Sequence, residues 1–168
     1  MSEAWWRAGD RAGDRTILAH SGEDLRFWGR GYRDSYYVPV LHSEGPLAPQ
    51  SMVFQLLRAI SETSAQVWAH NWKHDSHVLS REGLGMPKNA MDSMLMMWLL
   101  GRESGSNRSR FGLKALAKRW LDIEMPSFTD TFGKTPIQLM DATDVMEYAA
   151  LDAAAVAQLV SKFHVELG

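Results

Sequence analysis

The sequence predicts an α/β domain in which a small sheet, with a β-hairpin at its edge, is packed by several helices. Three observations support this prediction. Segments of β-rich composition are confined to the first half of the chain, and a short apolar strand pattern at residues 67–70 lies between two helical patterns. After residue 92 the apolar residues recur mostly with helical spacing. A small sheet followed by helices is typical of α/β and α+β domains.

Length and composition indicate one globular domain. The chain has 168 residues, and 45% of them are hydrophobic, which is ordinary for a domain with a single core. The formal net charge of −2 does not indicate a protein that binds nucleic acid over its whole surface, but it is compatible with local basic patches. The absence of cysteine excludes disulfides and thiolate zinc sites. Since no membrane-span or signal-peptide pattern is present, we expect a cytoplasmic protein without a membrane partner.

The polar residues at the start of the chain predict an arm ahead of the domain. Residues 7–10 and 11–14 both have the sequence Arg-Ala-Gly-Asp, but two copies of four residues do not make a repeat architecture. We therefore expect a flexible arm over residues 1–15 and a single domain over residues 16–168.

The first strands are expected to form the hairpin. Residues 16–19 have the composition of a short strand. Residues 25–32 and 35–40 are rich in aromatic or β-branched side chains, and we expect them to pair around a turn at residues 33–34. Pro39 lacks a backbone N–H, so it places the second of these strands at a sheet edge or at the end of a ladder.

Two helices are expected on either side of the strand at residues 67–70. Ser51 opens the first helix, whose apolar positions follow the spacing of one helical face. These positions are Val53, Leu56, Leu57 and Ile60. The second helix is expected over residues 73–82, because Gly83 is a natural C-cap.

The middle of the second half is expected to alternate helices and loops. Asp92 should cap a helix over residues 93–100, which is apolar on nearly all sides and should therefore be buried. Residues 101–110 are rich in Ser, Gly and Arg and predict a mobile basic loop. An amphipathic helix follows at residues 113–120, and residues 124–134 are expected to be irregular.

The last long helix, capped by Thr143, carries a pair of side chains that are candidates for catalysis or metal binding. Its buried stripe is expected to consist of Val145, Ala149, Val156, Leu159, Val160 and Phe163. Tyr148 and Asp152 are four residues apart, so they lie on one face, one turn from each other. A phenol beside a carboxylate is suited to position water and bind a metal. The structural alternative is a Tyr packed at a core edge beside a solvated Asp.

Asp75 is a second candidate, because it lies in the first turn of a helix just past a strand end. Ligands collect at the carboxyl ends of strands in open α/β sheets, and a carboxylate there can hold a cation. The structural alternative is an acid favoured by the helix dipole. Nearby, His70, His74 and His77 make a zinc site conceivable, while ring packing is the simpler role for His74.

Taken in order, four segments resemble the 3′–5′ proofreading exonuclease domain of family A DNA polymerases, particularly phage polymerases. The segments are residues 71–75, 92–95, 113–117 and 148–152. The resemblance implies a ribonuclease H-like fold, with a small mixed sheet packed by helices. In that family four acidic residues bind two divalent metals, Mg²⁺ or Mn²⁺, which activate water and stabilise the leaving 3′ oxygen.

The resemblance also implies roles for individual residues. Asp75 and Asp152 would be catalytic metal ligands, Tyr148 would orient the attacking water, and Asp92 would support the site as a helix cap. A further group of polar and basic residues would contact single-stranded DNA or a DNA 3′ end, in part through phosphates. These residues are Asn71, Lys73, Arg102, Arg108, Arg110 and Lys114.

The family's first motif, Asp-x-Glu, has no counterpart before residue 35. Glu23 and Asp24 are candidate substitutes, although adjacent residues on a strand point to opposite faces. Two hypotheses follow. The chain is a 3′–5′ exonuclease, impaired in isolation by the loss of this motif, or it is a non-catalytic module that binds nucleic acid or docks to a separate polymerase subunit.

Overall fold

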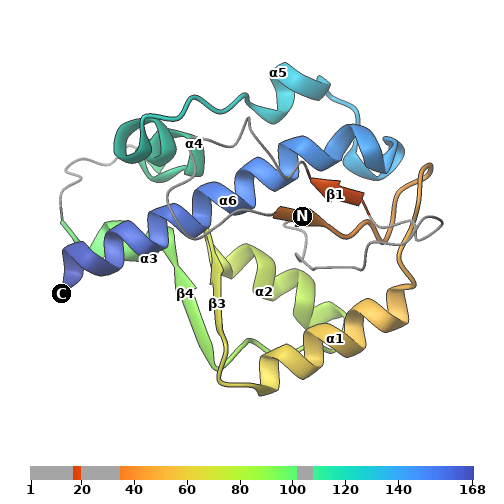
Figure 1. Ribbon diagram of the computed structural model, residues 1–168, viewed down its shortest axis with the longest axis horizontal. Coiled ribbons are helices and arrows are strands. Elements are labelled where there is room, and N and C mark those ends of the chain that lie inside the picture. Colours follow the sequence, from red (N-terminus) through yellow and green to blue (C-terminus); the bar gives the residue numbers. More distant parts are fainter. Residues whose placement is uncertain (1–16, 20–34, 102–107) are drawn as a thin grey trace.

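The computed structural model describes residues 17–19, 35–101 and 108–168 (Figure 1). The expected arm at residues 1–15 lies outside these ranges. The helices and strands, in chain order, are β1 (Ile17–Ala19), β2 (Ser35–Tyr37), α1 (Gln50–Glu62), β3 (Gln66–Ala69), α2 (Trp72–Arg81), β4 (Asn89–Asp92), α3 (Ser93–Leu99), α4 (Leu113–Leu116), α5 (Phe128–Phe132) and α6 (Ala142–Leu167). A 3₁₀ turn at Arg108–Phe111 precedes α4, a π-helical turn at Ala117–Leu121 follows it, and a second 3₁₀ turn at Ile137–Leu139 precedes α6.

The described strands form two small pairs. β1 pairs antiparallel with β2, and β3 pairs parallel with β4, with Ala69 opposite Asp92. A helix-rich fold with a small parallel pair agrees with the predicted α/β class. The expected hairpin is not confirmed, because the partner of β2 is β1 and residues 20–34 lie outside the described ranges. The parallel strand β4 was missed because its sequence, Asn-Ala-Met-Asp, has little β-rich character.

Helix α6 is the central element of the fold, and it crosses the molecule between the strands and the segment that carries α4 and α5 (Figure 1). The predicted stripe is confirmed, since all six of its residues are buried. The C-terminal half of α6 packs in one core cluster with Met96, Met97 and Leu116, and its N-terminal half packs in another with Tyr37 and Met140. A single amphipathic helix therefore joins both hydrophobic clusters.

Helix α3 is less buried than the sequence predicted. Met96 and Met97 are buried, but Leu95, Trp98 and Leu99 are each at least 60% exposed. The prediction was wrong because α3 packs on α6 by one face. A helix that is apolar on all sides buries only the faces that other elements cover.

Other helical segments also differ from expectation. Helix α5 occupies part of a segment that we expected to be irregular, and Ser127 caps it by accepting the Asp130 N–H at 3.1 Å. The N-cap of α6 is Asp141 and not Thr143, because the Asp141 carboxylate accepts the Thr143 N–H at 2.7 Å. The predicted helix at residues 113–120 continues beyond α4 as the π-helical turn.

Helix α2 lies close to its expected position and is followed by the predicted glycine. It runs one residue out of step with the prediction at each end, and Gly83 follows it with a φ of 68°. This left-handed conformation is the one that favours glycine after a helix. Among the described residues, none of the helices has both the length and the apolar character needed to cross a membrane.

Candidate active site

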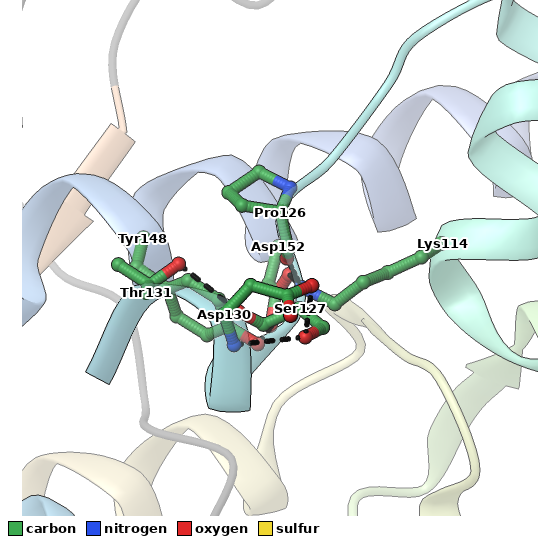
Figure 2. Close-up of polar contacts among 7 residues, drawn as sticks. All are labelled: Lys114, Pro126, Ser127, Asp130, Thr131, Tyr148 and Asp152. Carbon is green, nitrogen blue, oxygen red and sulfur yellow. Dashed lines mark hydrogen bonds and ion pairs between the residues drawn. The ribbon is translucent and has the colours of Figure 1, made fainter. Parts of the chain in front are cut away.

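Three side chains from two helices converge on one face of α6 (Figure 2). Lys114 of α4 donates a hydrogen bond from Nζ to the Tyr148 hydroxyl at 2.8 Å, and its Nζ lies 3.8 Å from Asp152 Oδ1. The same Nζ donates to the carbonyl oxygen of Pro126 and lies 4.2 Å from the centre of the Tyr148 ring. We call Lys114, Tyr148 and Asp152 the Tyr–Asp site.

The predicted pairing of Tyr148 and Asp152 on one helix face is therefore correct as geometry. The third member comes from a segment 34 residues earlier in the chain. Lys114 was expected to contact nucleic acid beside a basic loop. Its ammonium group contacts the pair on α6, and its contact with nucleic acid stays a prediction.

Burial and charge act against each other in the Tyr–Asp site. Burial raises the pKa of Asp152, and the positive charge of Lys114 opposes this shift. Burial lowers the pKa of Lys114, and the negative charge of Asp152 opposes that shift in turn. Both side chains remain about a third exposed, at 31% and 33%, so water screens the ion pair. Each charge therefore helps its partner to stay ionised.

Tyr148 keeps its proton across the neutral pH range. Burial first, and then the negative charge of Asp152, raises the pKa of the phenol to about 12. The phenol oxygen accepts the Lys114 hydrogen bond, so the Tyr148 O–H remains able to donate. Tyr148 can thus hold a water molecule or a phosphate oxygen beside the Asp152 carboxylate.

Helix α5 fixes the ring of Tyr148. The Phe128 and Phe132 rings meet the Tyr148 ring edge-on, with centroid separations of 5.9 and 5.4 Å. Edge-to-face contacts of this kind are favourable for aromatic rings. Sequence reasoning missed these two residues as parts of the site. The signal that could have located α5 is Ser127 followed three residues later by Asp130, the spacing of a capped helix start.

Asp92 holds the turn that leads into α2. Its carboxylate accepts the backbone N–H groups of Asn71 at 2.9 Å, of Trp72 at 2.8 Å and of Met94 at 2.8 Å. The Met94 bond confirms the predicted cap of α3. The other two bonds stabilise Asn71, which has a positive φ of 65°, at the start of α2. Asp75, a buried residue in the first turn of α2, depends on this turn for its position.

The other predicted site residues divide into two groups. Lys73 and Arg110 are exposed. Arg102, Glu23 and Asp24 lie outside the described residues, and for Arg108 the backbone alone is described. The convergence of Asp75 with the Tyr–Asp site stays a prediction. Within the part of the chain that the structure describes, no three His, Asp or Glu side chains come together as a group able to hold a metal ion.

The histidine alternative finds no support among the described residues. His70 shares a hydrogen bond of 2.9 Å with the buried Ser93, through its Nδ1, and burial lowers its pKa. His74 and His77 are exposed on α2, and the described residues hold no metal-binding group that includes them. Ring packing for His74 stays a prediction.

Comparison with known proteins identifies the family to which the chain belongs. A family model described as 3′–5′ exonuclease, of the DNA polymerase A exonuclease type, matches residues 31–168. DNA polymerase I of Treponema pallidum (strain Nichols) is 28% identical over 118 residues, which cover 66% of this chain and 11% of that relative. The chain therefore matches only a small part of the relative's length. Because the family model covers most of this chain, the chain belongs to the 3′–5′ exonuclease domain family of A-type DNA polymerases.

Proposed function

We propose that this domain removes nucleotides from DNA 3′ ends by hydrolysing the terminal phosphodiester bond. The observation that carries the proposal is the Tyr–Asp site, where a protonated phenol and a carboxylate share one face of α6. Tyr148 would hold the attacking water through its O–H, and Asp152 would accept hydrogen bonds or a cation beside it. Family membership supports the reaction class.

Divalent cations, Mg²⁺ or Mn²⁺, belong to this proposal, and Asp152 fits such a cation. Its Oδ1 is shielded from water and has no hydrogen-bond partner within the described residues. Carboxylate oxygens are ligands that hard divalent cations prefer. Asp75 would be the second ligand, and further ligands would come from outside the described ranges, where Glu23 and Asp24 lie. When bound, such cations polarise water and stabilise the leaving oxygen.

The substrate contacts are proposed for exposed polar and basic residues. Lys73 and Arg110 are exposed, and with Asn71, Arg102 and Arg108 they would contact the phosphates of a single-stranded 3′ end. Binding through phosphates weakens as the salt concentration rises. A separate polymerase subunit is a proposed partner, by analogy with the polymerase that the matched relative's name describes.

The test is degradation of a 5′-labelled single-stranded oligonucleotide by the purified chain with Mn²⁺. A 3′–5′ exonuclease produces a ladder of labelled strands that shorten by one nucleotide at a time. Asp152→Asn should lower the rate by about a hundredfold, which corresponds to roughly 3 kcal/mol of lost transition-state stabilisation. Glu147→Gln is the matched control, because Glu147 is an exposed acid on the same helix. Equal rates for both variants would refute the assignment of Asp152.

A non-catalytic module is the second candidate, and one observation favours it. The described residues bring together no three-ligand metal group, although the family reaction uses four acids. Under this alternative the chain binds single-stranded DNA in a salt-dependent way without shortening it. Fluorescence anisotropy of a labelled oligonucleotide, measured beside the degradation assay, separates the two candidates.

A further inference from the structure

Lys114 is surrounded by oxygen atoms in a way that an exposed lysine is not. Its Nζ faces the Tyr148 hydroxyl, the Pro126 carbonyl and Asp152 Oδ1. Nζ donates hydrogen bonds to the first two oxygens. Its contact with Asp152 Oδ1, at 3.8 Å, is an ion pair that leaves this oxygen without a hydrogen bond. Lys118, on the same stretch of chain, pairs with the exposed Glu124, and its side chain is 68% exposed against 31% for Lys114.

The oxygens around Lys114 are also those that a divalent cation would use. Carboxylate and carbonyl oxygens are typical ligands of Mg²⁺, which binds them at about 2.1 Å. Lys114 Nζ lies 3.8 Å from Asp152 Oδ1. A divalent ion on that oxygen would bring two positive centres within a few ångströms of each other. Such like charges repel at short range, so the ammonium group and the ion compete for Asp152.

We infer that Lys114 is the resident cation of the Tyr–Asp site, and that a divalent ion binds Asp152 by displacing the Lys114 ammonium group. This inference rests on the proposed function, because it concerns the same carboxylate. Lys114 is suited to the exchange, since its four-carbon stem is flexible and its charge is strongly hydrated once released. Without metal it neutralises Asp152 and holds the Tyr148 hydroxyl. With metal it leaves the carboxylate and becomes free for another anion. Lys114 is therefore a positioning residue, which acts through Asp152 and lowers the affinity of that carboxylate for the metal.

The first test is Mn²⁺ binding, measured as free Mn²⁺ by electron paramagnetic resonance, which needs no DNA and no turnover. Lys114→Met removes the competing charge and should lower the Mn²⁺ dissociation constant by about fivefold, the scale of a partly screened ion pair. Lys114→Arg keeps the charge and should bind Mn²⁺ within about twofold of the wild type. Lys118→Met is the matched control for net charge and should also leave the affinity unchanged.

Three outcomes would overturn the inference. Lys114→Met could bind Mn²⁺ no more tightly than the wild type. Lys118→Met could gain affinity as much as Lys114→Met, which would make the effect one of net charge. All variants could fail to bind Mn²⁺. Adding Asp152→Asn to Lys114→Met should abolish the gain, and a gain that persists would place the ion elsewhere.

A second measurement follows the wild-type chain during metal titration, and a variant is needed only to assign the signal. The Lys114 ammonium group should give a nuclear magnetic resonance signal that shifts on titration with Mg²⁺, and Lys114→Arg identifies that signal. A signal that is unchanged at saturating Mg²⁺ refutes displacement. Failure of the proposed function is distinguishable, because a chain could exchange Lys114 for metal without degrading DNA. Conversely, a chain could degrade DNA with a metal affinity that Lys114 does not affect.

Discussion

Replacing Asp92 tests how much one carboxylate stabilises the fold and the turn that leads into α2, the helix that carries Asp75. Its two oxygens accept three backbone N–H groups, from Asn71, Trp72 and Met94, at 2.8–2.9 Å. Hydrogen bonds to a charged group are worth about 1.5–3 kcal/mol each, and neighbouring terms are not additive. We therefore expect Asp92→Ala to lower the free energy of unfolding by about 4 kcal/mol. That is a large part of the 5–15 kcal/mol typical of a domain.

The milder variant Asp92→Asn keeps the side-chain volume nearly constant, so it isolates the contribution of the hydrogen bonds to stability. The amide keeps one acceptor oxygen but turns a donor toward a backbone N–H, so we expect a loss of about 2 kcal/mol. Urea denaturation followed by tryptophan fluorescence measures both losses, and Trp72 lies next to the perturbed turn. Hydrogen exchange should also accelerate at the amides that Asp92 binds. The exposed Glu62, changed to Ala, is the control. A loss below about 1 kcal/mol for Asp92→Ala would refute this reasoning.

Three further predictions follow from the core and the Tyr–Asp site. Phe163→Ala should lower the free energy of unfolding by about 3–5 kcal/mol, measured by urea denaturation. The reason is that Phe163 is fully buried and its ring meets the Trp120 ring edge-on, with centroids 5.2 Å apart. Changing the exposed Val165 to Ala should lower it by less than about 0.5 kcal/mol. Tyr148→Phe keeps the ring contacts and removes the hydroxyl, so it should slow DNA degradation by about tenfold to a hundredfold while the melting temperature stays nearly constant. Since folding raises the pKa of Tyr148 from 10.0 to about 12, the free energy of unfolding should not change through this group below pH 10 and should fall as the pH rises toward 12. Tyr148→Phe should remove this fall.

Each of these predictions has an outcome that contradicts it. Equal losses for Phe163→Ala and Val165→Ala would mean that the core cluster on α6 contributes little. A Tyr148→Phe variant that degrades DNA at the wild-type rate would remove the phenol from the mechanism. Identical stability profiles of the wild type and Tyr148→Phe between pH 10 and 12 would show that the buried phenol does not titrate with folding.

The sequence by itself determined the features that depend on spacing within one segment. The stripe on α6 follows from helical periodicity, and the shared face of Tyr148 and Asp152 follows from their separation of four residues. Gly83 marked the end of α2 because a left-handed residue there favours glycine. The family was also readable, because the order of its short segments along the chain needs no three-dimensional information.

The tertiary structure decided which groups meet across long separations. The partner of Tyr148 is Lys114, 34 residues away, and Asp92 accepts the N–H groups of a turn about 20 residues earlier. Helix α3 has apolar residues on nearly all sides, yet its exposed face was set by where α6 lies. Periodicity describes the faces of one helix, whereas burial and ion pairing depend on which other element covers each face. For that reason the sequence located two members of the Tyr–Asp site, and folding supplied the Lys114 ammonium group that contacts both.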